Sequence, residues 1–116
     1  MKQIKEHAWV DGFQGAVTVC DMHGKIVEMN ARAAETFGRY GRAQLIGKNL
    51  RDCHPPKANA IIGRMLETGE SNIYTIEKKG VRKLIYQSPW IEGGKRMGLV
   101  ELSLEIPENM PHYIRD

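Results

Sequence analysis

Apolar and polar positions form two short β-like segments near the start of the chain, and a tight turn separates them. Residues 16–20 (AVTVC) are an apolar, β-branched run, and residues 25–29 (KIVEM) are a second. Between them, Asp21 can accept hydrogen bonds from the backbone that follows, and Gly24 adopts a positive φ without steric cost. The pattern therefore predicts a β-hairpin. A hairpin is not stable alone, so further strands must join it.

Helical spacing follows the hairpin. Asn30 is a good N-cap for a helix over Ala31–Phe37, in which Ala34 and Phe37 face inwards. The glycines at 38 and 41 then end it, and Arg42–Leu45 adds one more turn.

A second, longer helix is predicted over Lys57–Thr68. Pro56 suits its first turn, and Gly69 is a suitable C-terminal cap. Its apolar residues lie on one stripe at helical spacing. The stripe consists of Ala58, Ile61, Ile62, Met65 and Leu66.

Three strands are predicted at the end of the chain, over Asn72–Glu77, Val81–Ile91 and Arg96–Ile106, with glycine-containing turns between them. On the second, Leu84, Tyr86, Ser88 and Trp90 share one face, and Lys83, Ile85 and Gln87 share the other. We expect the first of these faces to line the interior. Strands at both ends of the chain around central helices indicate an α+β fold, with one antiparallel sheet and helices packed on one face.

The chain divides into three parts by its pattern. Residues 1–11 form an N-terminal helical segment over Lys2–Asp11, in which Trp9 is a packing residue or a partner contact. Residues 12–106 form the folded domain, and residues 107–116, with two prolines, form an extended tail or linker.

Composition fits one soluble domain with a reduced interior. The 116 residues are 41% hydrophobic and carry a formal net charge of +3, which is typical of a single globular domain. The basic residues are scattered, so nucleic-acid binding rests on the mild charge alone and is not expected. No apolar run is long enough to span a membrane, and no secretory signal begins the chain. Two cysteines without CxxC spacing favour free thiols in the cytoplasm.

Motifs for catalysis are missing from the sequence. There is no Gly-x-Ser-x-Gly, no His-Glu-x-x-His and no phosphate-binding glycine-rich loop. Asp52 and His54 have no nucleophile beside them, and Cys53 next to His54 lacks the further ligands that a zinc site needs. We therefore expect that the protein is not an enzyme.

The order and spacing of these elements resemble the PAS domain family over about residues 11–106. The residues that carry the resemblance are Gly15-Ala16-Val17, Asp21, Gly24, Asn30, Ala33-Ala34, Phe37-Gly38, Leu45-Ile46-Gly47-Lys48 and His54-Pro55. The resemblance implies a five-stranded antiparallel sheet in the order 2-1-5-4-3, with small helices that enclose a pocket. It also implies sensing or protein interaction, and a homodimer formed through the N-terminal helix and the outer face of the sheet.

The resemblance leaves the ligand open. Flavin-photosensing PAS domains carry a cysteine in a Gly-(Arg/Lys)-Asn-Cys-Arg motif, but this chain has Leu50 at the cysteine position, so that thiol chemistry is missing. Haem is the sharper hypothesis, because His54 lies in the region from which some PAS domains take their axial ligand to iron. Trp90 or Tyr86 would then donate a hydrogen bond to bound O2.

The sequence thus predicts a sensory PAS domain with a small-molecule pocket, with haem or another ligand in it, that passes the state of the ligand to an effector or a signalling partner. The alternative is a ligand-free module that dimerises through Trp9 and the sheet. The predicted cofactor-binding residues are His54, Ile61, Ile62, Met65, Leu84, Tyr86 and Trp90, with His54 as the ligand of haem iron.

Overall fold

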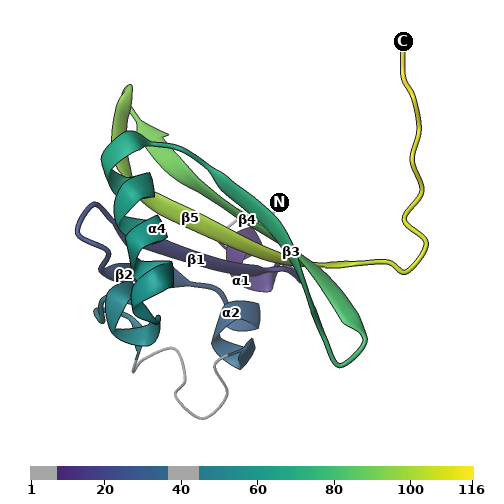
Figure 1. Cartoon of the computed structure of the whole chain (residues 1–116), viewed down its shortest axis with the longest axis horizontal. Coiled ribbons are helices and arrows are strands. Elements are labelled where there is room, and N and C mark those ends of the chain that lie inside the picture. Colours follow the sequence, from purple (N-terminus) through teal and green to yellow (C-terminus); the bar gives the residue numbers. More distant parts are fainter. Residues whose placement is uncertain (1–7, 37–44) are drawn as a thin grey trace, which may run out of the picture.

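Five antiparallel strands form one sheet in the order β2-β1-β5-β4-β3, as the sequence predicted (Figure 1). The structure is a computed structural model that describes residues 8–36 and 45–116, apart from the side chains at 51 and 53. Its strands are β1 (Ala16–Asp21), β2 (Ile26–Met29), β3 (Asn72–Lys78), β4 (Val81–Glu92) and β5 (Lys95–Ile106). Its helices are α1 (Ala8–Gly12), α2 (Ala31–Thr36), the 3-10 helix η2 (Leu50–Cys53) and α4 (Pro56–Thr68).

The first hairpin, β1 and β2, is closed by Asp21 and Gly24, as the sequence predicted. The Asp21 carboxylate accepts hydrogen bonds from the backbone N–H groups of His23 and Lys25, each at 2.9 Å. Gly24 has a φ of 83°, which closes the turn at a conformation that a side chain would strain. The turn sets the register of β1 and β2 and delivers the chain to Asn30.

Asn30 connects the hairpin to α2 and is almost fully buried. Its side-chain oxygen accepts hydrogen bonds from the backbone N–H groups of Ala33 and Val17, both at 2.9 Å. Its amide nitrogen donates to the carbonyl oxygen of Gly15 at 2.8 Å and to that of Val10 at 2.9 Å. The predicted N-cap is therefore confirmed, and the same side chain also fixes the start of β1.

Helix α4 begins and ends close to the predicted residues. Pro56 is at its first turn, and Gly69 ends it with a φ of 77° and an N–H that donates to the carbonyl of Met65 at 2.8 Å. This is the left-handed glycine cap that the sequence predicted. Ile62, Met65 and Leu66 are the buried residues of the helix, whereas Ile61 is largely exposed. The helix therefore covers the sheet with a narrower stripe than the sequence predicted.

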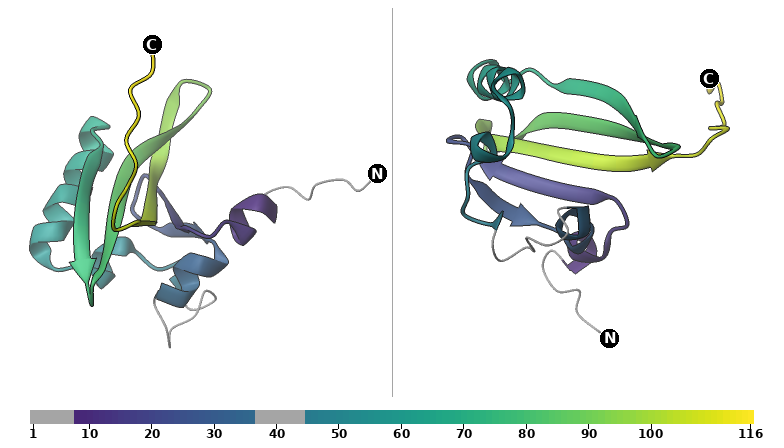
Figure 2. Two further views of the ribbon diagram at one scale, coloured as in Figure 1. Left: turned by 90° about the vertical axis from the view of Figure 1, so that its right-hand side faces the viewer. Right: turned by 60° about the horizontal axis from the view of Figure 1, so that its bottom comes forward.

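Among the described residues, two clusters of buried apolar side chains meet at Leu50, which packs against both. The first, between β1, β2 and α2, contains Ala16, Ile26, Met29, Ala33 and Leu45. The second, between α4 and the middle of the sheet, contains Cys20, Ile62, Met65, Leu66 and Leu99. The helices that carry these clusters lie on one side of the sheet (Figure 2). We call the side that faces α4 the inner face and the opposite side the outer face.

Some predictions fall partly outside the described residues. The N-terminal helix is described only from Ala8, where α1 carries an exposed Trp9. Phe37 and most of the turn predicted over Arg42–Leu45 lie outside the description. Pro107–Asp116 has neither helix nor strand and leads away from the sheet, as Figure 1 shows.

Candidate functional site

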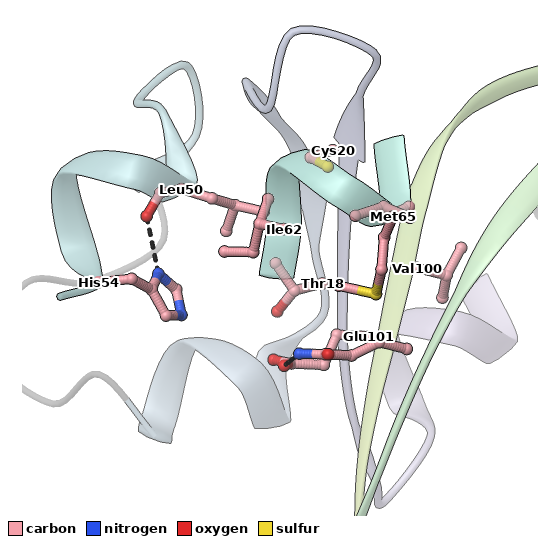
Figure 3. A pocket seen from close by; sticks show the side chains of 10 residues that line it. Thr18, Cys20, Leu50, His54, Ile62, Met65, Val100 and Glu101 are labelled. Atoms are coloured by element: carbon pink, nitrogen blue, oxygen red, sulfur yellow. Dashed lines mark hydrogen bonds between the residues drawn. The ribbon is translucent and has the colours of Figure 1, made fainter. Parts of the chain in front are cut away.

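A small cavity lies between α4, η2 and the inner face of the sheet, and we call it the inner hollow. Its volume is about 30 Å³, which is enough for water but not for an organic ligand. Figure 3 shows His54 and Leu50 on one side of it, with Thr18 and Glu101 from the sheet across from them. The residues that line it are Thr18, Cys20, Leu50, His54, Ile62, Met65, Gln87, Leu99, Val100 and Glu101.

A larger hollow adjoins it between α4 and β3, and we call it the side groove. Its volume is about 330 Å³. It shares His54, Ile62 and Gln87 with the inner hollow, so the two spaces meet at these side chains. Its other lining residues are Ala58, Ile61, Asn72 and Tyr74. Together the two hollows reach the lower end of the size range of ligand pockets, which is about 300–1,000 Å³.

The inner wall of both hollows carries four polar side chains from four different strands, which we call the polar row. Strand register places Thr18 of β1 beside Glu101 of β5, Glu101 beside Gln87 of β4, and Gln87 beside Asn72 of β3. The Gln87 amide donates to the Glu101 carboxylate at 2.6 Å, and the Asn72 amide donates to the Gln87 oxygen at 2.9 Å. Because a carboxylate only accepts, Glu101 fixes the orientation of both amides.

His54 faces the polar row from the short segment between η2 and α4. Its Nδ1 lies 2.7 Å from the carbonyl oxygen of Leu50. Since a carbonyl oxygen only accepts, Nδ1 must carry the proton, and in the neutral ring Nε2 is then an acceptor. The next turn is held by the Asn59 amide, which donates to the carbonyl oxygen of His54 at 3.2 Å. Acceptors at this site therefore include the His54 Nε2 and the Glu101 carboxylate.

The surroundings of the site also shift the pKa values of two further groups, the Cys20 thiol and the Tyr74 hydroxyl. Burial raises the pKa of the Cys20 thiol above its usual value, and the charges of Asp21 and Glu101 add to this effect. Partial burial, followed by the charge of Glu101, raises the pKa of the Tyr74 hydroxyl. Both groups are therefore held neutral, and Cys20 is an inert core residue rather than a reactive thiol.

The prediction that Leu84, Tyr86 and Trp90 line the interior is wrong. The alternation along β4 is as predicted, but Ile85 is the buried residue and Gln87 lines both hollows, so the opposite set faces inwards. Leu84 and Tyr86 therefore lie on the outer face.

Trp90 has a structural contact in place of the predicted one with bound O2. Its indole N–H donates to the backbone carbonyl of Cys20 at 3.1 Å. Gly98 lies between them on β5, and a Cβ there would collide with that same carbonyl oxygen. The indole therefore crosses the strand where a side chain has no room, and it ties β4 to β1.

The predicted residues on α4 and before it do come together. His54, Ile62 and Met65 line the inner hollow, and Ile61 lines the side groove. The sequence analysis did not identify Thr18, Gln87 or Glu101 as site residues. The signal that could have found Gln87 is its place in the same alternating set as Ile85, the one large aliphatic residue of that set.

The fit to haem is incomplete. The Nδ1 of His54 donates a hydrogen bond to a backbone carbonyl, which is the support that ligating histidines usually have. The space beside it does not match, because the inner hollow is about 30 Å³ and Glu101 stands on its far wall. Haem iron needs only one axial side chain; for a metal ion bound by side chains alone, no group of three or more potential ligands gathers among residues 8–36 and 45–116.

Comparison with known families decides the classification. A family profile described as "PAS domain" matches residues 14–88, which is most of the folded part of the chain. This chain belongs to the PAS domain family. PAS domains are sensory modules of signalling proteins, and nothing in these comparisons indicates a catalytic family. The predicted family, sheet order and fold class are thus confirmed.

Solved structures show the same fold at low sequence identity. The PAS domain of the histidine kinase ThkA is 21% identical, with a TM-score of 0.64 over 78% of this chain and 97% of that one. VqmA of Vibrio cholerae, a LuxR-type receptor, is 16% identical, with a TM-score of 0.68 over 93% of this chain and 53% of that one. The Aer2 receptor of Vibrio cholerae, a dual PAS-haem oxygen sensor, is 19% identical, with a TM-score of 0.58 over 84% of this chain and 99% of that one.

These likenesses concern the fold alone, because all three identities are low. A search of curated proteins found no match to the sequence. No helix in the described part of the chain is long and apolar enough to cross a membrane.

Proposed function

We propose that this PAS domain is a sensor that binds a small organic molecule in the side groove and the inner hollow. The observation that carries the proposal is the polar row, which continues from the groove at Asn72 to Glu101 in the interior. A wall that only had to pack against α4 would be apolar, since polar groups lose free energy on burial unless they find partners. Here the partners are arranged in one line that faces a space.

The chemistry of the wall limits the class of ligand. Glu101 and His54 both offer acceptors, so the ligand needs at least one N–H or O–H donor. Ile61 and Ile62 supply the apolar side of the space, so the rest of the ligand is apolar or aromatic. A small heterocycle with a ring N–H or a hydroxyl group meets both requirements.

Signalling follows if the ligand prefers one of two arrangements of the groove. The groove lies between α4 and β3, and these elements make few direct contacts, so their separation is the distance that a ligand can change. That an effector or a partner protein receives the signal is a prediction from the sequence. The cytoplasmic location of the protein is also a prediction from the sequence. The division into residues 1–11, 12–106 and 107–116 is likewise a prediction.

Extraction and return of the ligand test this proposal. The purified protein is denatured, released small molecules are identified by mass spectrometry, and each is added back to ligand-free protein. A true ligand raises the melting temperature in a concentration-dependent way, because it binds the folded state only. The proposal fails if no released compound, and no member of a library of small heterocycles, stabilises the protein.

Haem is the second candidate ligand, and the orientation of His54 favours it. Haem reconstitution followed by an absorption spectrum tests it, with His54→Ala as the variant. A Soret band that shifts in His54→Ala supports ligation by this residue. No band after reconstitution, or the same band in the variant, removes His54 as the ligand.

A ligand-free interaction module is the alternative function, and exposed apolar side chains favour it. Trp9 on α1 is 70% exposed, and Tyr86 is 40% exposed on the outer face. This function predicts a homodimer that Trp9→Ala weakens. A protein that stays monomeric at high concentration, with or without Trp9, counts against it.

A further inference from the structure

The two edges of the sheet differ in how they are protected. At the β2 edge, Ile26 donates its N–H to the carbonyl of Lys48 and accepts from the N–H of Gly47, both at 2.8 Å. A bridge between Lys25 and Asn49 extends this cover. The other edge is β3, which is seven residues long (Figure 1). Among the described residues, no loop forms such bonds along its outward side.

The turn after β3 determines which of its backbone groups point outwards. Lys79 and Gly80 form a two-residue loop with φ angles of 52° and 78°, and two positive φ angles in such a loop make a type I′ turn. In such a hairpin the flanking residues, Lys78 and Val81, form a hydrogen-bonded pair, and every second residue does the same. The N–H and C=O groups of Ile73, Thr75 and Glu77 therefore point away from β4, towards solvent.

The side chains of β3 favour pairing with a further strand at this edge. Ile73, Tyr74 and Ile76 are all more than 40% exposed. Edge strands normally avoid association by prolines, bulges, short length or charges. The β3 edge has no proline and no shift in its register with β4, and its charges are confined to Glu77 and Lys78 at one end. Glu77 is also partly neutralised by Arg82, at 3.8 Å.

We propose that β3 pairs antiparallel with β3 of a second copy of this chain, about a two-fold axis at Thr75. This register pairs all seven residues of the strand. It also makes Thr75 and the partner's Thr75 a hydrogen-bonded pair, and the outward groups of Ile73 meet those of the partner's Glu77. The two sheets then become one continuous sheet.

The centre of β3, from Tyr74 to Ile76, is complementary to itself in this register. Tyr74 lies opposite the partner's Ile76, and symmetry repeats the pair on the other side of the axis. Aromatic and β-branched residues stabilise each other across strands, as two threonines do. Tyr74 and Ile76 are also in the non-hydrogen-bonded positions, where side chains lie closest together. A second copy therefore fits this edge better than an unrelated peptide, which would match it only by chance.

The surroundings leave room for this partner. Figure 2 shows α4 beside only one end of β3, and the rest of the strand extends past it. Because a single pair of strands buries less surface than a standard interface of about 1,600 Å², we expect a dimer that forms in a concentration-dependent way. Tyr74 also lines the side groove, so the interface adjoins the proposed ligand site without depending on it.

Cysteine cross-linking tests the register directly. In Thr75→Cys, the two new cysteines have Cα atoms about 5.5 Å apart across the axis, within the range for a disulfide. In the matched control Ile73→Cys, on the same face of the same strand, the separation is about 14 Å. Wild-type protein carries the same native cysteines and sets the background. We expect a covalent dimer under mild oxidation from Thr75→Cys only; equal yields from the two variants would overturn the proposal.

A second variant separates this edge from the outer face. Thr75→Pro removes an N–H that points outwards, so the pairing of β3 with β4 is kept while the dimer loses a hydrogen bond on each side of the axis. We expect its dissociation constant to rise about tenfold or more, whereas Thr75→Ser leaves it unchanged. Circular dichroism confirms that both variants fold. The proposal is wrong if wild-type protein is monomeric at millimolar concentration, or if Tyr86→Lys abolishes a dimer that Thr75→Pro leaves intact.

Discussion

The two faces of the sheet differ in where their polar groups lie: the inner face combines buried apolar residues (Cys20, Ile85, Leu99) with a polar row, and the outer face exposes apolar side chains. On the inner face, under α4, Glu101, Gln87 and Asn72 form a hydrogen-bonded polar row. On the outer face, Leu84 and Tyr86 lie at least partly open to solvent. The polar row faces the space that we propose as the ligand site, and exposed apolar surface on the opposite face is a candidate for protein contacts. Polarity alone therefore does not identify the interior of such a sheet.

Isoleucine truncation gives the largest effect that this comparison predicts. Ile85 on the inner face is 6% exposed, and Ile73 on the outer face is 52% exposed. We expect Ile85→Ala to lower the free energy of unfolding by about 3 kcal/mol, through lost burial and a new cavity. The same substitution at Ile73 should change it by about 0.5 kcal/mol or less.

Urea unfolding of the two variants, at a concentration where the protein is monomeric, measures both values. The residue type and the substitution are matched, so the two values compare a buried isoleucine on the inner face of β4 with an exposed one on the outer face of the edge strand β3. If Ile73→Ala destabilised the protein as much as Ile85→Ala, the assignment of the faces would be reversed.

Substitution of Trp90 is expected to have the next largest effect on the free energy of unfolding. Trp90→Phe keeps an aromatic ring but loses the indole N–H that donates to the carbonyl of Cys20. We expect a loss of about 1 kcal/mol in the free energy of unfolding, the usual contribution of one such hydrogen bond. Chemical denaturation followed by circular dichroism checks it. An unchanged stability would mean that the contact with Cys20 contributes nothing.

The titration of Tyr74 gives the smallest effect and reports on the polar row. Burial and then the charge of Glu101 raise the pKa of its hydroxyl above 10.0. The folded state thus disfavours the ionised phenol, so the contribution of Tyr74 to stability is present below about pH 10 and is lost as the pH rises through the pKa of the folded state. Glu101→Gln should lower the pKa of Tyr74 towards its ordinary value.

The ultraviolet absorbance of tyrosinate follows this titration, and Tyr74→Phe in each background isolates the signal of Tyr74. The expected shift in Glu101→Gln is downwards and partial, because burial remains. An upward shift, or none, would show that the carboxylate does not act on Tyr74.

Local signals in the sequence were enough for most of the fold. Asp21 and Gly24 predicted the first hairpin, Asn30 its connection to α2, and Pro56 with Gly69 the bounds of α4. Each of these residues acts through backbone groups within a few positions, so its effect can be read from neighbouring residues. The sheet order came from the family resemblance that these residues carry together.

The residues of the candidate site could not be predicted from short sequence patterns, because contacts between distant strands bring them together. Asn72, Gln87 and Glu101 meet only because the registers of three strands align them, and no short pattern marks them as a set. The choice of the inner face was wrong for the same reason, since alternation along β4 separates two faces but does not say which one a distant helix covers. His54 could be predicted because it adjoins the start of a helix whose bounds were clear.

The central claim, that the polar row on the inner face binds a small molecule, is tested most directly by native mass spectrometry. Wild-type protein is compared with Gln87→Leu and with Tyr86→Leu, which changes the next residue of β4 on the opposite face. We predict a bound small molecule on wild-type protein and on Tyr86→Leu that Gln87→Leu has lost. A ligand retained by Gln87→Leu, or lost from Tyr86→Leu instead, would contradict the account.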